Sequence, residues 1–223
     1  MIYTVISTKN RPLMLERCIA SLQSESVKTM LFVVSDDAET REVAGKAYRD
    51  SAIQSIILDH TISWIDAVVD GICFFERNYD PRPDDLIYLC ADDYEMREGW
   101  VDRTERFMAS AGPALCSLEL EPLFPWNTPL SHVEYNGVKG IGRMSLPGAN
   151  WIMRYDMWPT VQAAMLQHRA DITVDLDTCA DLHGYGIPLL AIDEADHIGA
   201  YESSNGNQAF QVDARPLPKE WRL

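Results

Sequence analysis

The chain has 223 residues, of which 47% are hydrophobic and 24% are charged. A chain of this length and composition can bury the core of one α/β domain, and no apolar run approaches the ~20 residues that a membrane-spanning helix needs. The formal net charge of −15 argues against a basic nucleic-acid groove as the main binding surface. The sequence begins on a strand-like run with no visible secretory leader, and its five cysteines are scattered. We therefore expect reduced thiols and a cytoplasmic location.

Strand-like and helical segments alternate through the first half of the chain. Short runs rich in Ile, Val and Leu predict strands, and segments with apolar residues on one helical face predict helices between them. The first helix is expected to be capped by Asn10, with Pro12 in its first turn. The predicted strands are 2–7, 30–35, 55–58 and 85–90, and the further predicted helices are 40–48, 63–77 and 99–110. This alternation implies right-handed crossovers and a largely parallel sheet.

The second half of the chain is less regular. Residues 114–121 and 187–192 have the apolar character of strands, whereas 155–168 and 175–183 are expected to be helical, the latter stopped by Gly184. Residues 122–148 are rich in Pro, Gly, Trp and Asn, which predicts a long loop or a short hairpin that covers the edge of the sheet. No repeat or linker marks a second domain, so we expect a single domain over residues 1–223.

Polar residues follow four of the predicted strands. In parallel α/β sheets, ligands bind beyond the carboxyl ends of the strands, so these residues predict one binding rim. Asp92 and Asp93 are the most unusual, because they come directly after a run fit for a buried strand. Such carboxylates repel each other unless they face water or hold a cation. The four groups are 7–11, 35–37, 59–60 and 92–93.

A family resemblance is carried by the segment VISTKNRPLMLERCIASL at residues 5–22. It resembles the opening of the GT-A nucleotide-sugar glycosyltransferases, the family-2-like group in particular. Further similar stretches, DAVVDGI, CADDYEMREGW, GANWIMRYDMW and VDLDTCADLHGYGI, follow in the order of that family, so the resemblance covers most of the chain. It implies a GT-A, Rossmann-like fold with a nucleotide-sugar-binding half at 1–97 and an acceptor and catalytic half at 98–223. A UDP-sugar is the default donor that it implies.

The resemblance also implies donor and metal contacts. The residues matched to the donor side are Thr8, Asn10, Arg11, Asp36, Asp37 and Asp92. Asp92 and Asp93, together with His197 in the "HIG" stretch, are expected to hold Mn²⁺ or Mg²⁺, which take oxygen ligands and bridge carboxylates to a diphosphate. The sequence departs from the family at Ala91, in place of the first acid, and at Val69, in place of an Asn. The alternatives are an exposed turn for the acidic pair and a purely structural histidine.

The acceptor side is matched to Gly148, Asn150 and Trp151. A glycine there lets the backbone approach a sugar, and Trp151 either stacks on its apolar face or belongs to the core. Asp175 falls where inverting members keep the base that takes the proton of the acceptor hydroxyl. Asp177 is the reserve candidate for that role, and a helix N-cap is the alternative for Asp175.

Two classes of function follow. The first is a metal-dependent, inverting glycosyltransferase. The second is a nucleotide or sugar-nucleotide binding protein or a nucleotidyltransferase-like relative, which the absence of glycine from "STKNRP" disfavours. The acceptor stays open among a small glycoside, a protein side chain and a hydroxylated base in DNA of the kind that some phages modify. For DNA, Lys139 and Arg143 are the positive charges near the expected acceptor side.

Overall fold

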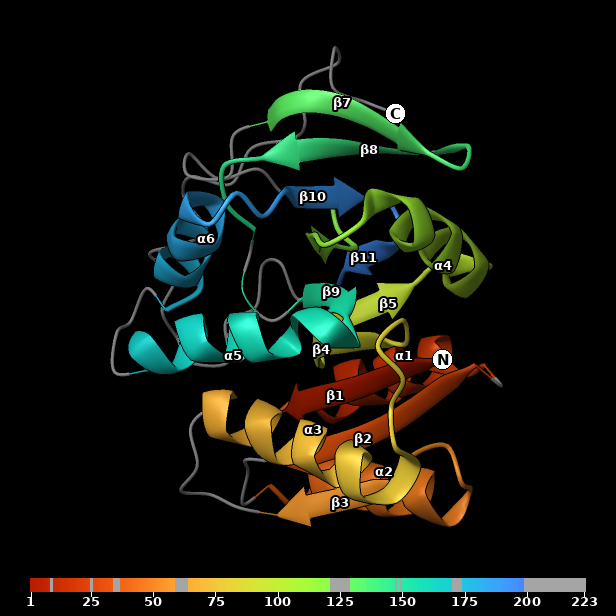
Figure 1. The fold of residues 1–223 in the computed structure, drawn as a ribbon. Coiled ribbons are helices and arrows are strands. Elements are labelled where there is room, and N and C mark those ends of the chain that lie inside the picture. Colours follow the sequence, from red (N-terminus) through yellow and green to blue (C-terminus); the bar gives the residue numbers. More distant parts are fainter. Residues whose placement is uncertain are drawn as a thin grey trace, which may run out of the picture.

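In the computed structural model, the described residues are 1–8, 10–24, 26–33, 37–58, 64–120, 129–146, 148, 150–169 and 174–198. They form three layers, with a mixed sheet between two layers of helices (Figure 1). None of the helices in these ranges is long and apolar enough to cross a membrane. All five cysteines are free thiols, in agreement with the prediction from their scattered positions.

The central sheet is the middle layer. Within the described ranges its nine strands are β1 (Ile2–Thr8), β2 (Val27–Val33), β3 (Ser55–Leu58), β4 (Leu86–Ala91), β6 (Leu115–Ser117), β7 (Pro129–Tyr135), β8 (Val138–Arg143), β9 (Asn150–Arg154) and β10 (Leu189–Ile192). Their order across the sheet is β3-β2-β1-β4-β9-β6-β10-β8-β7. All of them except β8 and β9 run in one direction, so the prediction of a mostly parallel sheet is confirmed.

Helices cover both faces of the sheet (Figure 1). One face packs against α1 (Pro12–Leu22), α2 (Ala38–Arg49) and α4 (Trp100–Ala111). The other packs against α3 (Trp64–Tyr79), α5 (Trp158–Gln167), which follows the short helix η1 (Tyr155–Met157), and α6 (Val174–Gly184). Each helix does so through apolar residues that recur every three or four positions, as Leu15, Cys18, Ile19 and Leu22 do in α1.

The strands beside the predicted rim are buried on both faces. In β1, Ile2 and Ile6 enter the core on the side of α1, whereas Tyr3 and Val5 enter the core on the side of α3. This alternation is the two-residue period of a strand. Because both sides are covered, β1 and β4 consist of almost continuous apolar runs. Burial of each large aliphatic side chain contributes about 1.5–3 kcal/mol, which makes this central part of the sheet a firm base for the rim.

Two predicted helix boundaries differ from the structure. Asn10 does not cap α1, because it adopts a left-handed conformation (φ 55°) and the cap position falls on Arg11. The helix α6 ends at Gly184 itself, one residue beyond the predicted end at His183. The left-handed residue beyond α6 is Gly186 (φ 77°), whose N–H donates to the carbonyl of His183.

The segments around the rim contain two local structures. A hairpin of β7 and β8, joined at Asn136-Gly137 with positive φ at both residues, realises the hairpin alternative for the second half of the chain. A separate two-stranded antiparallel sheet pairs β5 (Tyr94–Met96) with β11 (Ala195–His197). No sequence pattern predicts this small sheet, since three-residue strands are too short for a periodic pattern.

Candidate functional site

Thr8, Asp92 and Asp93 meet at the carboxyl ends of β1 and β4. The two strands are parallel neighbours in which Ser7 pairs with Ala91, so the residues that follow them share one edge. The hydroxyl of Thr8 donates a hydrogen bond to the carboxylate of Asp92. Asp92 and Asp93 are only 3% and 6% exposed. The acidic pair is therefore not an exposed turn, and it needs a positive partner.

Arg11 is one such partner. Its Nη1 lies 3.2 Å from Oδ1 of Asp92 and 2.5 Å from Oδ2 of Asp93. The left-handed Asn10 turns the chain between β1 and α1, so Arg11 stands at the start of the helix, over the acidic pair. Burial of an uncompensated carboxylate costs several kcal/mol, and the guanidinium offsets that cost for both acids. Arg11 thus supplies part of the positive charge that the sequence pattern predicts beside Asp92 and Asp93.

His197 reaches Asp93 from β11. Its Nε2 lies 3.3 Å from Oδ2 of Asp93, and its Nδ1 lies 3.1 Å from Oε1 of Glu119. Burial alone would lower the pKa of the imidazole, but the hydrogen bonds to Asp93 and Glu119 outweigh it and raise the pKa of His197 to about 10. Burial likewise opposes ionisation of Asp93, yet His197 and Arg11 hold its pKa below the ordinary value. In this arrangement an imidazolium bridges two carboxylates.

The small β5–β11 sheet sets the position of His197. Its register places His197 opposite Tyr94, and the N–H of Ile198 donates to the carbonyl of Asp93 at 2.8 Å. The ring of Tyr94 stacks on the imidazole, with centroids 4.6 Å apart. In Figure 1, β11 lies beside β5. A residue far along the chain is thereby held over the acidic pair.

One carboxylate oxygen of Asp93 takes no part in the contacts with Arg11 and His197. Its Oδ1 is buried and has no hydrogen-bond partner among the residues that the structure describes. Leaving a buried acceptor unsatisfied is costly, and Mg²⁺ and Mn²⁺ bind such oxygens. Oδ1 of Asp93 would hold a divalent cation, and Nε2 of His197 would join it once the imidazolium has released the proton that Nε2 shares with Asp93. The predicted three-ligand set is not assembled, because Asp92 turns to Thr8 and Arg11, and the described ranges hold no group of three or more potential metal ligands.

Asp37 has a local role. Its carboxylate accepts hydrogen bonds from the backbone N–H groups of Glu39 and Thr40, at 3.4 and 2.9 Å, and thereby caps α2. The Thr40 hydroxyl and these N–H groups lower the pKa of Asp37. Asp36 lies outside the described residues. The donor contacts predicted for both residues stay predictions.

Asp175 lies against Gly148 on the expected acceptor side. The N–H of Gly148 donates to Oδ2 of Asp175 at 3.2 Å, and a Cβ on Gly148 would come within 3.0 Å of the same oxygen. The glycine thus allows close approach of Asp175, where the sequence analysis expected a sugar. Burial raises the pKa of Asp175, although backbone N–H groups oppose the rise. Asp175 and the half-buried Asp177 lie within the first turn of α6, so Asp175 is not the residue preceding the helix, as an N-cap would be.

The prediction that Trp151 stacks on the acceptor is wrong. Trp151 is 0% exposed and packs edge-on against Trp64, with ring centroids 6.1 Å apart. It belongs to the core, which was the alternative. Asn150 is also 0% exposed, and its Oδ1 accepts a hydrogen bond of 3.0 Å from the hydroxyl of Tyr88. Neither side chain offers a surface to a sugar, because β9 lies between β4 and β6 under both helical layers.

Comparisons with known proteins find similarity at the level of structure. No protein-family model and no curated protein matches the sequence. The chain superposes with a TM-score of 0.62 and 9% identity on GalNAc-T7, in a crystal structure with UDP, GalNAc and Mn²⁺, covering 87% of this chain and 43% of that one. For the mannosyltransferase PcManGT from Pyrobaculum calidifontis, in complex with GDP-Man and Mn²⁺, the TM-score is 0.57 at 8% identity, covering 84% and 53%.

S. aureus TarS gives a TM-score of 0.56 at 8% identity, covering 94% of this chain and 41% of that one. The fold is that of the GT-A glycosyltransferases. The chain spans about half the length of these proteins or less. A neighbour of another kind is 4-diphosphocytidyl-2C-methyl-D-erythritol synthase, with a TM-score of 0.50 at 13% identity, covering 88% of this chain and 91% of that one. At these identities the likeness establishes the fold alone.

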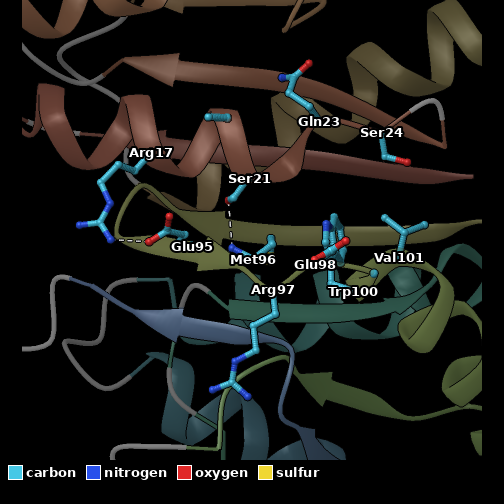
Figure 2. Close-up of a pocket in the computed structure, with 12 residues that line it drawn as sticks. Arg17, Ser21, Gln23, Ser24, Glu95, Met96, Arg97, Glu98, Trp100 and Val101 are labelled. Carbon is cyan, nitrogen blue, oxygen red and sulfur yellow. Dashed lines mark hydrogen bonds and ion pairs between the residues drawn. The ribbon is translucent and has the colours of Figure 1, made fainter.

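A cleft of about 620 Å³ runs beside this site of the GT-A fold, between α1 and the segment that joins β5 to α4. Figure 2 shows Arg17 pointing to Glu95 at one end of the cleft, while Trp100 and Val101 line the other end. Glu95 is therefore paired with Arg17 and does not join Asp93.

Glu119 is the part of the site region that sequence reasoning missed, and Arg143, which was expected to face an acceptor, lies buried near it. Both are 1% exposed, and Glu119 accepts a hydrogen bond of 2.9 Å from the hydroxyl of Tyr94 in addition to its contact with His197. Burial lowers the pKa of Arg143 to about 10, opposed by the nearby charge of Glu119. A buried Arg143 cannot contact DNA, which leaves only the exposed Lys139 of the two predicted charges. The sequence feature that could have indicated a functional role for Glu119 is its position as an acidic residue inside the apolar run 115–120.

Proposed function

We propose that this protein is a metal-dependent glycosyltransferase that moves a sugar from a nucleotide-sugar donor to an acceptor hydroxyl. The observation that carries the proposal is Asp93, which is buried at the carboxyl end of β4, within reach of His197, and has one carboxylate oxygen without a partner in the described part of the chain. Similar folds have been solved with Mn²⁺ and UDP or GDP-Man, which supports this interpretation. A UDP-sugar is the default donor.

On the donor side, the proposal assigns the divalent cation, Mn²⁺ or Mg²⁺, to Asp93 and His197. When bound, the cation neutralises charge on the leaving diphosphate. Arg11 carries a guanidinium at the same edge, and its planar donors suit diphosphate oxygens. The remaining proposed nucleotide contacts are Thr8, Asn10, Asp36, Asp37 and Asp92.

On the acceptor side, the proposal assigns the base to Asp175, with Asp177 in reserve. The N–H of Gly148 fixes one oxygen of Asp175, and burial raises the pKa of this carboxyl. A carboxylate with a raised pKa takes a proton from the attacking hydroxyl more readily than an exposed one does. Transfer with inversion would follow from such a base. The division into a donor half at 1–97 and an acceptor half at 98–223 is part of this proposal, with His197 returning from the second half to the donor site.

The acceptor itself is left open. On this proposal the acceptor hydroxyl binds near the first turn of α6, where Asp175 contacts Gly148. A hydroxylated DNA base is the weakest of the three acceptor classes. The net charge is −15, and Arg143 is buried in the protein.

The test is thermal unfolding with UDP, GDP, CDP and dTDP, each with and without Mn²⁺. We expect one nucleotide to raise the melting temperature only when Mn²⁺ is present. At a ligand concentration 100 times the Kd, such binding stabilises the folded state by about 2.7 kcal/mol. Stabilisation without Mn²⁺, or by none of the nucleotides, would contradict the metal-dependent donor site. Release of nucleoside diphosphate from the matching nucleotide sugar then tests transfer.

A nucleotidyltransferase-like activity is the second candidate. It is favoured by the fold likeness to 4-diphosphocytidyl-2C-methyl-D-erythritol synthase, because the match covers 91% of that chain. The turn after β1 has the sequence STKNRP and no glycine, which counts against a glycine-rich phosphate loop. Release of pyrophosphate from a nucleoside triphosphate and a sugar phosphate would support this second function. Release of nucleoside diphosphate from a nucleotide sugar would support the first.

A further inference from the structure

Glu119 is a buried carboxylate that the proposed reaction does not use directly. We infer that Glu119 is a positioning residue, which holds the imidazole of His197 by Nδ1 and so presents Nε2 to Asp93 and to a divalent cation. The cation rests on the proposed function. The hydrogen bond from His197 to Glu119 does not, so the two can be tested separately.

Both oxygens of Glu119 are used. Oε1 accepts from Nδ1 of His197 at 3.1 Å, and Oε2 accepts from the hydroxyl of Tyr94 at 2.9 Å. The ring of Tyr94 in turn stacks on the imidazole, with an interplanar angle of 23°. The imidazole is thus held at one edge by a carboxylate and on one face by an aromatic ring, and both holders are bonded to each other. Its position is fixed by these two contacts, neither of which involves Asp93.

The backbone that carries Glu119 is also fixed. The carbonyl of Leu118 accepts from the N–H groups of Glu194 and Ala195, at 2.9 and 2.8 Å. The carbonyl of Leu120 accepts a hydrogen bond from the buried guanidinium of Arg143. The bonds to Leu118 tie the segment that follows β6 to the chain that enters β11, and the bond to Leu120 ties it to β8. The carboxylate and the histidine that it holds therefore stand on two segments that are joined by backbone hydrogen bonds.

A carboxylate is the group that this position requires. Imidazole binds a cation through Nε2 only when its remaining proton is on Nδ1, and an acceptor at Nδ1 keeps the proton there. A carboxylate in this outer position also makes the ligating nitrogen more basic.

The first test compares the affinity for Mn²⁺ alone in three variants. Glu119→Leu keeps the volume and removes both acceptors, and we expect it to weaken Mn²⁺ binding by about 10- to 100-fold. Glu119→Gln keeps one acceptor oxygen, so the expected loss is smaller. Glu194→Gln is the matched control, since Glu194 is equally buried but bonds to Arg103. An unchanged Mn²⁺ affinity in folded Glu119→Leu would overturn the inference.

The second test does not need the metal. A proton NMR resonance of the His197 ring N–H should lie far downfield in the wild-type protein, because the N–H is hydrogen-bonded to a carboxylate. It should be absent from His197→Gln, which assigns it, lost from Glu119→Leu and retained in Glu194→Gln. If Glu119→Leu does not fold, an upfield shift in Glu119→Gln serves instead, and no shift in Glu119→Gln overturns the inference. A wild-type protein that shows the resonance but binds no Mn²⁺ would refute the metal-dependent function while supporting the positioning role of Glu119.

Discussion

Nε2 of His197 lies 3.3 Å from Oδ2 of Asp93, although 104 positions separate the two residues in the chain. This contact joins the end of β4 to β11 and places an imidazole at the edge of the sheet where Arg11 already meets the acidic pair. The site therefore combines residues from both halves of the chain. Its charges alternate from Arg11 through Asp93 and His197 to Glu119.

Asp93→Asn keeps the size of the side chain and removes its charge. We expect the substitution to abolish the Mn²⁺-dependent stabilisation by nucleotide, a loss of about 2.7 kcal/mol at 100 times the wild-type Kd. The protein should still fold, because Arg11 retains Asp92 and His197 retains Glu119 as partners. Thermal unfolding with and without Mn²⁺ measures both effects.

The control is Asp196→Asn, at an exposed acid of β11 that pairs with Arg97, which should behave as the wild type. A wild-type response of Asp93→Asn would remove Asp93 from the metal site.

The stability of the protein should depend on His197 at alkaline pH. The pKa of His197 is about 10 in the folded state, compared with about 6.5 in an unfolded chain. Because the folded-state pKa is raised, the stabilisation is fully present below about pH 6.5 and is lost as the pH rises through about 10. Urea unfolding in the presence of a chelator, between about pH 6 and 10, measures this decline. His197→Gln should flatten it, and an equally steep decline in that variant would contradict the assignment.

Gly148→Ala should disturb Asp175. The added Cβ would lie 3.0 Å from Oδ2 and 3.1 Å from Cβ of Asp175, so this carboxylate must move. If Asp175 is the base, the rate of sugar transfer falls while nucleotide binding at the β4 edge is unchanged. Turnover under donor saturation and nucleotide titration measure the two effects. Gly184→Ala, at the other end of α6, meets nothing within 4 Å and is the matched control.

Asp175→Asn removes the proposed base with little change in shape. Proton transfer by a positioned side chain contributes about 10²- to 10⁴-fold to a rate, so we expect a loss of that size in turnover. Nucleotide binding should stay at the wild-type level, which separates this variant from Asp93→Asn. Normal turnover by Asp175→Asn would show that Asp175 is not the base. Asp177→Asn would then test whether Asp177 has that role.

Trp151→Ala should lower the free energy of unfolding. Trp151 is fully buried between the sheet and α3, where it contacts Trp64. Replacing a buried tryptophan by alanine costs about 3–5 kcal/mol of unfolding free energy. Urea unfolding measures the loss. A folded variant with wild-type stability but weaker acceptor binding would restore the stacking role that the burial of Trp151 rules out.

The local pattern of the sequence determined the strands and helices around the donor side. The apolar runs of β1 and β4, and the spacing of Leu15, Ile19 and Leu22, follow from the periods of strand and helix. The rule that parallel strands share a carboxyl edge was enough to predict that Thr8 lies close to Asp92. It also predicted that the buried acids need a cation.

Only the tertiary structure decided which groups complete the site. Asp93 and His197 meet because two three-residue strands, β5 and β11, pair across the chain, and such short strands have no periodic signature. Glu119 joins them because the neighbouring Leu118 carbonyl accepts from the N–H groups of Glu194 and Ala195. Trp151 and Arg143 became core residues because β9 and β8 are interior strands of the sheet, which neither side chain's own sequence context reveals. Periodicity shows which face of a segment is apolar, but which segments cover that face depends on the packing of the whole chain.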